Sequence, residues 1–334
     1  MMKILRQHSN DKLFQFLTGI FFSITAGLVA LLSIILMANW RESSLVHHTL
    51  PGIEETATNA VFLNKIPTST TINTLFTIVT VTDTPTPTQT IEPTPSPQFG
   101  QISVIGYSVE GRPIEVYQFG NGPRQRLIVA GIHGGYEWNT VVLAEELITY
   151  LMENPDLIAP EVTLFILKNL NPDGYYKAQD ATGRPNANGV DLNRNFDANW
   201  LIDWNRDVCF NQVYVTGGPE PHSEPETRAV IDFILSHEFE AMISYHSAGL
   251  GIFPGGIPPG PKSQMLAYYL SGISPYAYPP KDIGCVYSGA MANWAALHGI
   301  PSVDVELTTH GDTDFAINKR VLEYFIKADL ELGE

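Results

Sequence analysis

The chain has 334 residues, of which 44% are hydrophobic, and it carries a formal charge of −16 at pH 7. This negative charge argues against nucleic acid and anionic lipid surfaces as electrostatic partners. Most of it belongs to residues 100–334, which hold 14 Lys/Arg against 29 Asp/Glu. An acidic surface of this kind suits a cationic substrate, although it is more often a general property of soluble proteins.

The N-terminal region predicts a membrane anchor. Residues 14–38 contain no charged side chain, and Lys3, Arg6 and Lys12 precede them. This length spans a bilayer, and the basic flank predicts that residues 1–13 stay in the cytoplasm. We therefore expect a signal-anchor helix at 14–38 and a single-pass protein of the cell membrane, with its remaining part extracytoplasmic. Two alternatives stay open, namely a long cleaved signal peptide, which would give a secreted protein, and a buried core helix.

Residues 39–99 predict a disordered stalk. The segment 82–97 consists largely of Thr and Pro, which cannot bury a core and favour an extended spacer. Residues 100–334 are long enough to bury a single core and are expected to form the catalytic domain.

Strand and helix patterns alternate along residues 100–334. The expected strands are Pro113–Phe119, Leu127–Ile132, Val162–Leu170, Ala241–Tyr245 and Ser302–Leu307. The expected helices are Trp138–Met152, a helix opened by a capping box at Ser223–Glu226 and ending at Leu235, and Asn318–Leu332. This alternation predicts a single-domain α/β sandwich with a largely parallel or mixed sheet.

Chemically active residues follow three of these strands. The run Leu127–Ile132 stops at His133, with Glu137 four residues later, and Ala241–Tyr245 stops at His246. Ligands collect at the carboxyl ends of strands in open α/β sheets. Two imidazoles and a carboxylate there predict a zinc site with one coordination position open for chemistry.

Further residues supply what a zinc hydrolase needs. Glu306, carried by the run Ser302–Leu307, is a candidate general base. Asp191 is placed to orient a ligand histidine. Arg194 and Arg184 are candidates for docking a carboxylate and for stabilising a developing oxyanion.

The order of these motifs resembles the M14 zinc carboxypeptidases over about residues 102–330. Its most specific part is the string Arg184-Pro-Asn-Ala-Asn-Gly-Val-Asp-Leu-Asn-Arg-Asn-Phe196. The resemblance implies an α/β/α domain with a mixed, mainly eight-stranded sheet. It implies one Zn²⁺ bound by His133, Glu137 and His246. It also implies that Asn193 and Arg194 bind the terminal carboxylate of the substrate. Arg184 would contact the scissile carbonyl, and Glu306 would be the general base.

The chain departs from the family pattern at two places. Three residues separate His133 from Glu137, where the family usually has two. Glycines 134 and 135 could absorb the extra residue in the loop, or an i,i+4 pair at the start of a helix could face one ion. Glu145 and Glu146 are the other nearby carboxylates, but they lie too far along the expected helix. The family's mobile tyrosine has no exact counterpart, and Tyr287 is the nearest candidate.

Substrate specificity has two open interpretations. Asp304 shares a strand face with Glu306 and would favour a lysine, arginine or diaminopimelate side chain in the pocket. It would otherwise be a buried partner of a nearby donor. Ala292 lies near the usual specificity position and offers no charge. His310 is expected to lie in a solvated loop, with a position supporting the zinc site as the alternative. His298 is expected at a helix end and His237 at the surface.

These observations predict a membrane-anchored zinc metallocarboxypeptidase that hydrolyses C-terminal peptide bonds, with a water molecule on zinc as nucleophile. The alternative substrate is a cell-wall peptide, cleaved at a D-glutamyl–diaminopimelate bond. A non-catalytic peptide-binding module is the rival from another class. Cys209 and Cys285 are the only cysteines and can form one disulfide in an exported protein, although the sequence does not show that they lie close together.

Overall fold

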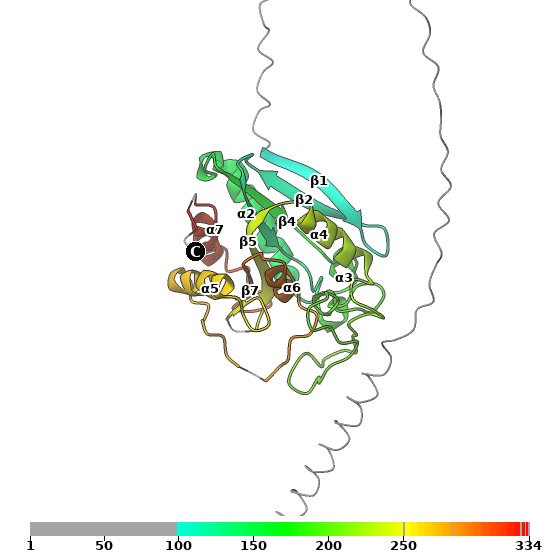
Figure 1. Ribbon diagram of the computed structural model, residues 1–334. Coiled ribbons are helices and arrows are strands. Elements are labelled where there is room, and N and C mark those ends of the chain that lie inside the picture. Colours follow the sequence, from blue (N-terminus) through cyan, green and yellow to red (C-terminus); the bar gives the residue numbers. More distant parts are fainter. Residues whose placement is uncertain (1–98, 250, 283, 328, 331, 333–334) are drawn as a thin grey trace, which may run out of the picture. The chain divides into compact units, whose positions relative to one another are not determined.

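The computed structural model describes residues 99–334 except 250, 283, 328, 331 and 333–334 (Figure 1). The predicted anchor at 14–38 and the predicted stalk, apart from residue 99, lie outside the described residues. Within the described part of the chain, no helix is long and apolar enough to cross a membrane.

The described residues build a seven-stranded mixed sheet in the order β1-β2-β4-β3-β5-β7-β6. Its strands are β1 (Phe99–Tyr107), β2 (Pro113–Phe119), β3 (Arg124–Val129), β4 (Val162–Leu167), β5 (Phe239–Ser247), β6 (Ile252–Pro254) and β7 (Ser302–Leu307). The central strands β4, β3, β5 and β7 are parallel to one another. At the edges, β2 pairs antiparallel with β4, β1 pairs antiparallel with β2, and β6 pairs antiparallel with β7. The α/β fold with a mixed sheet is confirmed, but the expectation of eight strands is wrong for this part of the chain.

Helices cover both faces of the sheet, which gives three layers (Figure 1). One core contains apolar side chains of α2 (Trp138–Glu153), α5 (Pro261–Ile273) and α7 (Phe315–Phe325). The other contains side chains of α4 (Pro225–Leu235) and α6 (Met291–Leu297). Alternate strand residues divide between the two cores, with Ile128 and Ile243 in the first and Leu127 and Met242 in the second. The central strands are therefore buried on both faces, which explains their continuous apolar sequences.

The predicted boundaries fail where local signals are weak. β2 and β7 have the expected bounds, whereas β3 and β4 each end three residues earlier than expected. β1 and β6 were not expected. β1 is an edge strand with four consecutive exposed residues, so it lacks the apolar pattern of a buried strand, and β6 has only three residues. α7 begins and ends earlier than the expected Asn318–Leu332.

The capping box predicted for α4 is wrong. Glu224 is the N-cap residue, and its side chain makes no capping hydrogen bond. Ser223 Oγ donates instead to the Glu224 carboxylate, while Glu226 is fully buried and accepts from the backbone N–H of Val109. The tertiary environment thus takes up the polar groups that would otherwise form a local cap.

Candidate metal centre and active-site cleft

The sheet brings three chemically active strand ends together. β5 lies between β3 and β7 and is parallel to both, so their carboxyl ends share one edge of the sheet. His246 lies in β5 directly beside Glu306 of β7. His133 and Glu137 lie in the turn that joins β3 to α2, and Glu137 is the N-cap residue of this helix. Strand register therefore places residues that are more than 100 positions apart at one site.

Two glycines allow the turn after β3 to carry the long spacer. Gly134 has a φ of +48°, a conformation that glycine tolerates best. A Cβ at Gly135 would lie 1.8 Å from the backbone oxygen of Ala178. The turn therefore packs against the neighbouring loop backbone, and the extra residue is absorbed before α2 begins rather than within its first turn.

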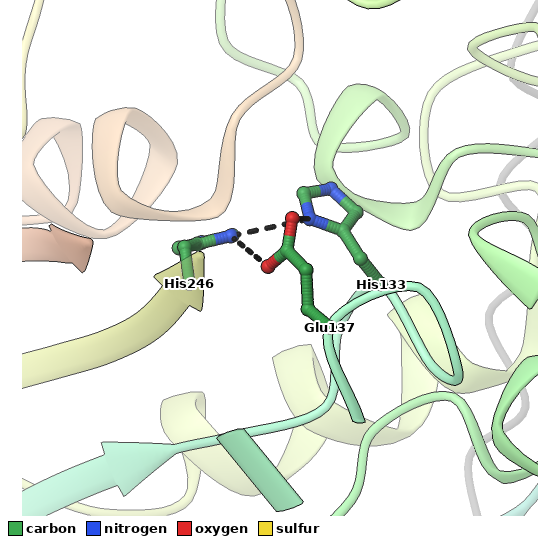
Figure 2. A group of neighbouring side chains, drawn as sticks. All are labelled: His133, Glu137 and His246. Atoms are coloured by element: carbon green, nitrogen blue, oxygen red, sulfur yellow. Dashed lines mark hydrogen bonds and ion pairs between the residues drawn. The ribbon is translucent and has the colours of Figure 1, made fainter. Parts of the chain in front are cut away.

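His133, Glu137 and His246 converge in one buried cluster (Figure 2). His133 Nδ1 lies 2.7 Å from Glu137 Oε1, and His246 Nδ1 lies 3.2 Å from Glu137 Oε2. The two Nδ1 atoms are 3.2 Å apart. Tetrahedral zinc with Zn–N bonds of 2.0–2.1 Å places neighbouring nitrogens about 3.3 Å apart, so the separation fits a zinc ion.

The hydrogen bonds behind the histidines support the same conclusion. His133 Nε2 lies 3.1 Å from Asp191 Oδ1, and His246 Nε2 lies 3.1 Å from Ser244 Oγ. If each Nε2 carries the proton that these acceptors need, both Nδ1 atoms present lone pairs to the cluster. Two lone pairs and a carboxylate then face one another with no imidazole proton between them, which is the donor set that binds a cation. The residues present therefore fit zinc.

Charge interactions keep the acidic groups of this cluster ionised. Burial raises the pKa of Glu137, but His133 and His246 in their protonated form outweigh it through charge and hydrogen bonds and hold this pKa well below its usual range. A zinc ion held by the neutral histidines would lower the pKa of Glu137 in the same direction. Burial likewise opposes ionisation of Asp191, while Arg184 and His133 keep its pKa well below normal. Asp191 is thus a permanent anion that can fix the orientation of a ligand histidine.

Glu306 differs from these carboxylates because its pKa is raised to about 7. Burial is the main cause, and the negative charge of Glu137 adds to it, whereas His246 acts in the opposite direction. Glu306 Oε2 accepts a hydrogen bond from the Gly249 N–H at 2.7 Å. A Cβ at Gly249 would lie 2.8 Å from the Glu306 carboxylate, so a larger residue there would displace the carboxylate from this position.

Arg184 is held between two carboxylates. Its Nε donates to Asp191 Oδ2 at 2.9 Å, and its Nη1 lies 3.3 Å from Glu137 Oε1. The guanidinium also stacks 4.4 Å from the centre of the Phe210 ring. The side chain is buried and lines the cleft beside the metal cluster, so it is placed to contact a substrate carbonyl.

Asn193 contacts the ring of His246 on the side opposite to Glu137, and Arg194 follows Asn193 in the chain. Asn193 Oδ1 accepts from the backbone N–H of Met291, and its amide nitrogen is 3.5 Å from His246 Nε2. Arg194 is buried over the Trp204 ring, and its Nε has no hydrogen-bond partner within the described residues. Burial lowers the pKa of this guanidinium, although Asp191 opposes the shift. A buried cation with a free donor is ready to bind an anion.

The sequence string from Arg184 to Phe196 forms the loop that holds Asn193 and Arg194. Asn186 Nδ2 donates to Glu224 and Glu226, and its Oδ1 accepts from the N–H of Asn188 and Val190. Asn195 ties the loop to the segment that contains Gly217. The asparagines of the string thus replace secondary structure with side-chain hydrogen bonds.

Tyr287 and Asp304 also line the cleft. The Tyr287 ring lies 5.6 Å from the Arg194 guanidinium, and burial raises the pKa of its hydroxyl. Asp304 Oδ1 is 3.4 Å from His246 Nε2, and 16% of its side chain is exposed. The same cleft is also lined by Ala290, Ala292 and Asn293, which carry no charge. Asp304 is therefore the charged residue among these four.

The cleft has a volume of about 800 Å³ and contains wall residues that the sequence did not identify. Tyr136, Phe210 and His310 line it, and His310 lies in a loop, as expected, but faces the cleft. No metal-ligand spacing or strand end marked these side chains. Cys209 and Cys285, which also line the cleft, form a disulfide between two of its loops.

Comparison with known proteins identifies the family. The profile of the zinc carboxypeptidase (peptidase M14) family matches residues 94–331. This chain is 29% identical to carboxypeptidase A4 of Mus musculus over 230 residues, which cover 59% of this chain and 54% of that protein. It is 32% identical to the carboxypeptidase N catalytic chain of Homo sapiens over 190 residues, which cover 46% and 39% of the two chains. The chain thus spans about half the length of such relatives, or less.

Solved structures share the fold. The murein-tripeptide amidase MpaA of Escherichia coli O157 has a TM-score of 0.51 at 24% identity, covering 70% of this chain and 94% of that one. Bovine thrombin-activatable fibrinolysis inhibitor has a TM-score of 0.53 at 22% identity, covering 68% and 86%. The protein belongs to the zinc carboxypeptidase family, and zinc is the metal that its His-Glu-His cluster is built to bind.

Proposed function

We propose that this protein is a zinc metallocarboxypeptidase that removes C-terminal residues from peptides. One observation carries the proposal: three groups line the same cleft. They are the zinc cluster, the Glu306 carboxylate with its raised pKa, and the buried Arg194 with a free donor. These are the groups needed to activate water, move a proton and bind a terminal carboxylate.

Glu306 acts as the general base of the proposed reaction. Bound Zn²⁺ would supply a Lewis acid that polarises the scissile carbonyl and acidifies water. Glu306 accepts the proton of the attacking water and returns it to the leaving amine. A pKa raised to about 7 suits both transfers, since the group can accept and release a proton near neutral pH. The Gly249 N–H holds the carboxylate toward the cluster.

Asn193 and Arg194 bind the terminal carboxylate of the peptide, and Arg184 binds the carbonyl oxygen. Arg194 has an unpaired buried donor, and Asn193 has an amide group next to it. Arg184 contacts Glu137 and lines the same cleft, which supports a contact between its guanidinium and the scissile carbonyl. Tyr287, stacked near Arg194, covers the bound terminus.

Asp304 gives the pocket a preference for a cationic C-terminal side chain. Three carboxylates line the cleft among the described residues. Glu137 belongs to the zinc cluster and Glu306 to proton transfer, so Asp304 remains for the substrate. Its contact with His246 does not neutralise it, because a histidine that holds zinc through Nδ1 is uncharged. Lysine, arginine and diaminopimelate all offer a matching cation, so cell-wall peptides ending in diaminopimelate remain the alternative substrates.

We also propose that the domain works outside the cytoplasm, attached to the cell membrane by the predicted helix at 14–38. The Cys209–Cys285 disulfide supports an oxidising compartment, where such bonds form and persist. Cell fractionation of the full chain, with protease added to intact cells, tests this. Recovery in the soluble cytoplasmic fraction would overturn it.

The Glu306→Gln variant tests the enzymatic function against the rival peptide-binding module. We expect full zinc content and a roughly 10²–10⁴-fold loss of peptide hydrolysis, as removal of a general base produces. Glu145→Gln is the matched control, since Glu145 is exposed on α2 outside the cleft. Zinc is measured by atomic absorption and products by mass spectrometry. Unchanged hydrolysis in Glu306→Gln, or wild-type protein without bound zinc, would overturn the mechanism.

A further inference from the structure

We propose that Tyr136, Phe210 and His310 form a subsite for an aromatic side chain on the substrate residue immediately before the scissile bond. This inference rests on the proposed peptidase function, because it assigns a part of the same cleft. The three rings, referred to below as the aromatic platform, line the cleft and are partly exposed in it.

The rings of the platform contact one another. The Tyr136 ring centre lies 5.3 Å from that of Phe210 and 4.6 Å from that of His310. Tyr136 therefore occupies the middle of a continuous surface built from three separate segments of the chain. It belongs to the long spacer between His133 and Glu137, so the lengthened turn that carries the zinc ligands also carries the central ring.

Contacts with the zinc cluster place the platform on the side away from the terminal-carboxylate site. His246 contacts Asn193 through Nε2 and Glu137 through Nδ1, so Asn193 and Glu137 lie on opposite sides of its ring. Arg184 contacts Glu137 and then stacks on Phe210 at 4.4 Å. A peptide bound with its terminus on Arg194 extends past the cluster in this direction.

His310 is anchored at the same side. Its Nδ1 lies 3.0 Å from the hydroxyl oxygen of Ser247, which follows His246 directly in the chain. The platform therefore begins one residue from a zinc ligand. This closeness to the cluster suits the substrate residue next to the scissile bond rather than a remote part of the peptide.

The chemistry of the platform selects an aromatic side chain rather than a charged one. Arg184 is already paired with Asp191 and Glu137, so its charge is balanced before any substrate binds. The Tyr136 hydroxyl accepts a hydrogen bond from Gln212, which holds the edge of the ring, and the Arg184 guanidinium lies 5.8 Å from the ring centre. Ring faces and edges bind other rings in stacked or edge-to-face geometry.

The disulfide keeps the platform together. Phe210 follows Cys209, which is bonded to Cys285 on the loop that carries Tyr287. Phe210 lies on a segment without a helix or strand between residues 197 and 215, so this covalent link restricts a ring that the sheet does not hold.

Peptide affinity of the zinc-loaded Glu306→Gln protein provides the test, because binding is then measured without hydrolysis. The probes are acetyl-Phe-X and acetyl-Gly-X, with X either lysine or leucine, and isothermal titration calorimetry gives each Kd. We expect the Phe peptides to bind at least tenfold more tightly than the Gly peptides. Adding Tyr136→Ala or Phe210→Ala should reduce this preference about two- to tenfold.

Three controls separate recognition from damage. Tyr107→Ala removes a half-exposed tyrosine of β1 outside the cleft and should leave the preference unchanged. Tyr136→Phe should retain it, because the ring remains. Zinc content is measured in every variant, since Tyr136 precedes a zinc ligand.

Equal affinities for Phe and Gly peptides, or a preference unchanged in both Tyr136→Ala and Phe210→Ala, would overturn the inference. Loss of affinity for both peptides together with zinc would also overturn it, because the ring would then act only on the fold. Wild-type protein that binds with the expected preference but hydrolyses no peptide would refute the proposed function alone.

Discussion

Two halves of the cleft are built in different ways. The chemical half, which comprises the zinc cluster and Glu306, stands at the ends of β3, β5 and β7, and parallel register fixes its geometry. The recognition half, which contains Phe210 and Tyr287, stands on segments 197–215 and 274–290, which contain no helix or strand in their described residues. A disulfide joins these two segments. The groups proposed to move protons thus lie on the sheet, whereas most groups proposed to select substrates lie on loops, with Asp304 of β7 as the exception.

The largest effect is expected from removal of a zinc ligand in the chemical half. His246→Ala leaves one imidazole and one carboxylate, which is too few ligands for a catalytic zinc site. We expect loss of stoichiometric zinc and hydrolysis at background. His298→Ala, which changes an exposed histidine at the end of α6, is the control and should keep both. Full zinc content in His246→Ala would show that the cluster is not the metal site.

Arg194→Ala should affect substrate binding without loss of zinc. Removing a buried cation that pairs with the terminal carboxylate should lower kcat/KM roughly 100-fold. Arg206→Ala is a matched control, because Arg206 stacks on the same Trp204 ring but lies outside the cleft lining. Steady-state kinetics with free and amidated C-termini give a direct check. The variant should lose its preference for the free terminus, and retention of that preference would contradict the docking role.

Asp304→Asn separates the two interpretations of this carboxylate. If Asp304 selects cationic side chains, kcat/KM for peptides ending in lysine should fall about tenfold relative to those ending in leucine, as the loss of one charge contact produces. Zinc affinity should stay unchanged. Asp232→Asn, at an exposed position of α4, is the control. An equal fall for both peptides together with weaker zinc binding would instead assign Asp304 to the support of His246.

The pH profile depends on Glu306 in the chemical half. The group must be ionised to accept a proton, so activity is lost as pH falls through its pKa, which is raised to about 7. Bound Zn²⁺ favours the anion and moves the acid limb below pH 7. We expect log kcat/KM to decline with unit slope, roughly tenfold per pH unit, below that limb. A flat profile from pH 4 to 7 would argue against Glu306 as the base.

The smallest effect on chemistry is expected from the disulfide. The double variant Cys209→Ser/Cys285→Ser should lower the free energy of unfolding by about 2–4 kcal/mol. KM should rise severalfold while zinc content and kcat change little, because only the recognition half is loosened. Chemical denaturation and kinetics of the same samples provide the measurements. A parallel loss of zinc would show that the two halves are coupled.

The sequence predicted the chemical half well because buried parallel strands have a recognisable pattern. Apolar runs ending at His133 and His246, and the run carrying Glu306, marked the strand ends that the structure brings together. The edge strands were harder to predict from the sequence, since β1 is largely exposed and β6 is very short. The α4 capping box was wrong because Glu226 is buried by contacts with residues far away in the chain.

The recognition half was largely beyond prediction. Tyr136 looked like a spacer residue and His310 like a solvated loop position, because neither has a periodic or ligand-spacing signal. Phe210 reaches Tyr136 through a loop that has no local pattern, and its neighbour Cys209 pairs with a cysteine 76 positions away. Such contacts depend on long-range packing, which sequence spacing does not encode.

The sequence alone indicated the family, the zinc ligands as a candidate set and the candidate residues for proton transfer and carboxylate binding, since each lies in a local motif. The tertiary structure decided that Glu137 joins the two histidines, that both histidines present Nδ1, and that three rings and a disulfide shape the cleft. The reason is physical. Local patterns specify strands, turns and their ends, whereas distances between side chains from separate segments exist only after the sheet and its loops have packed.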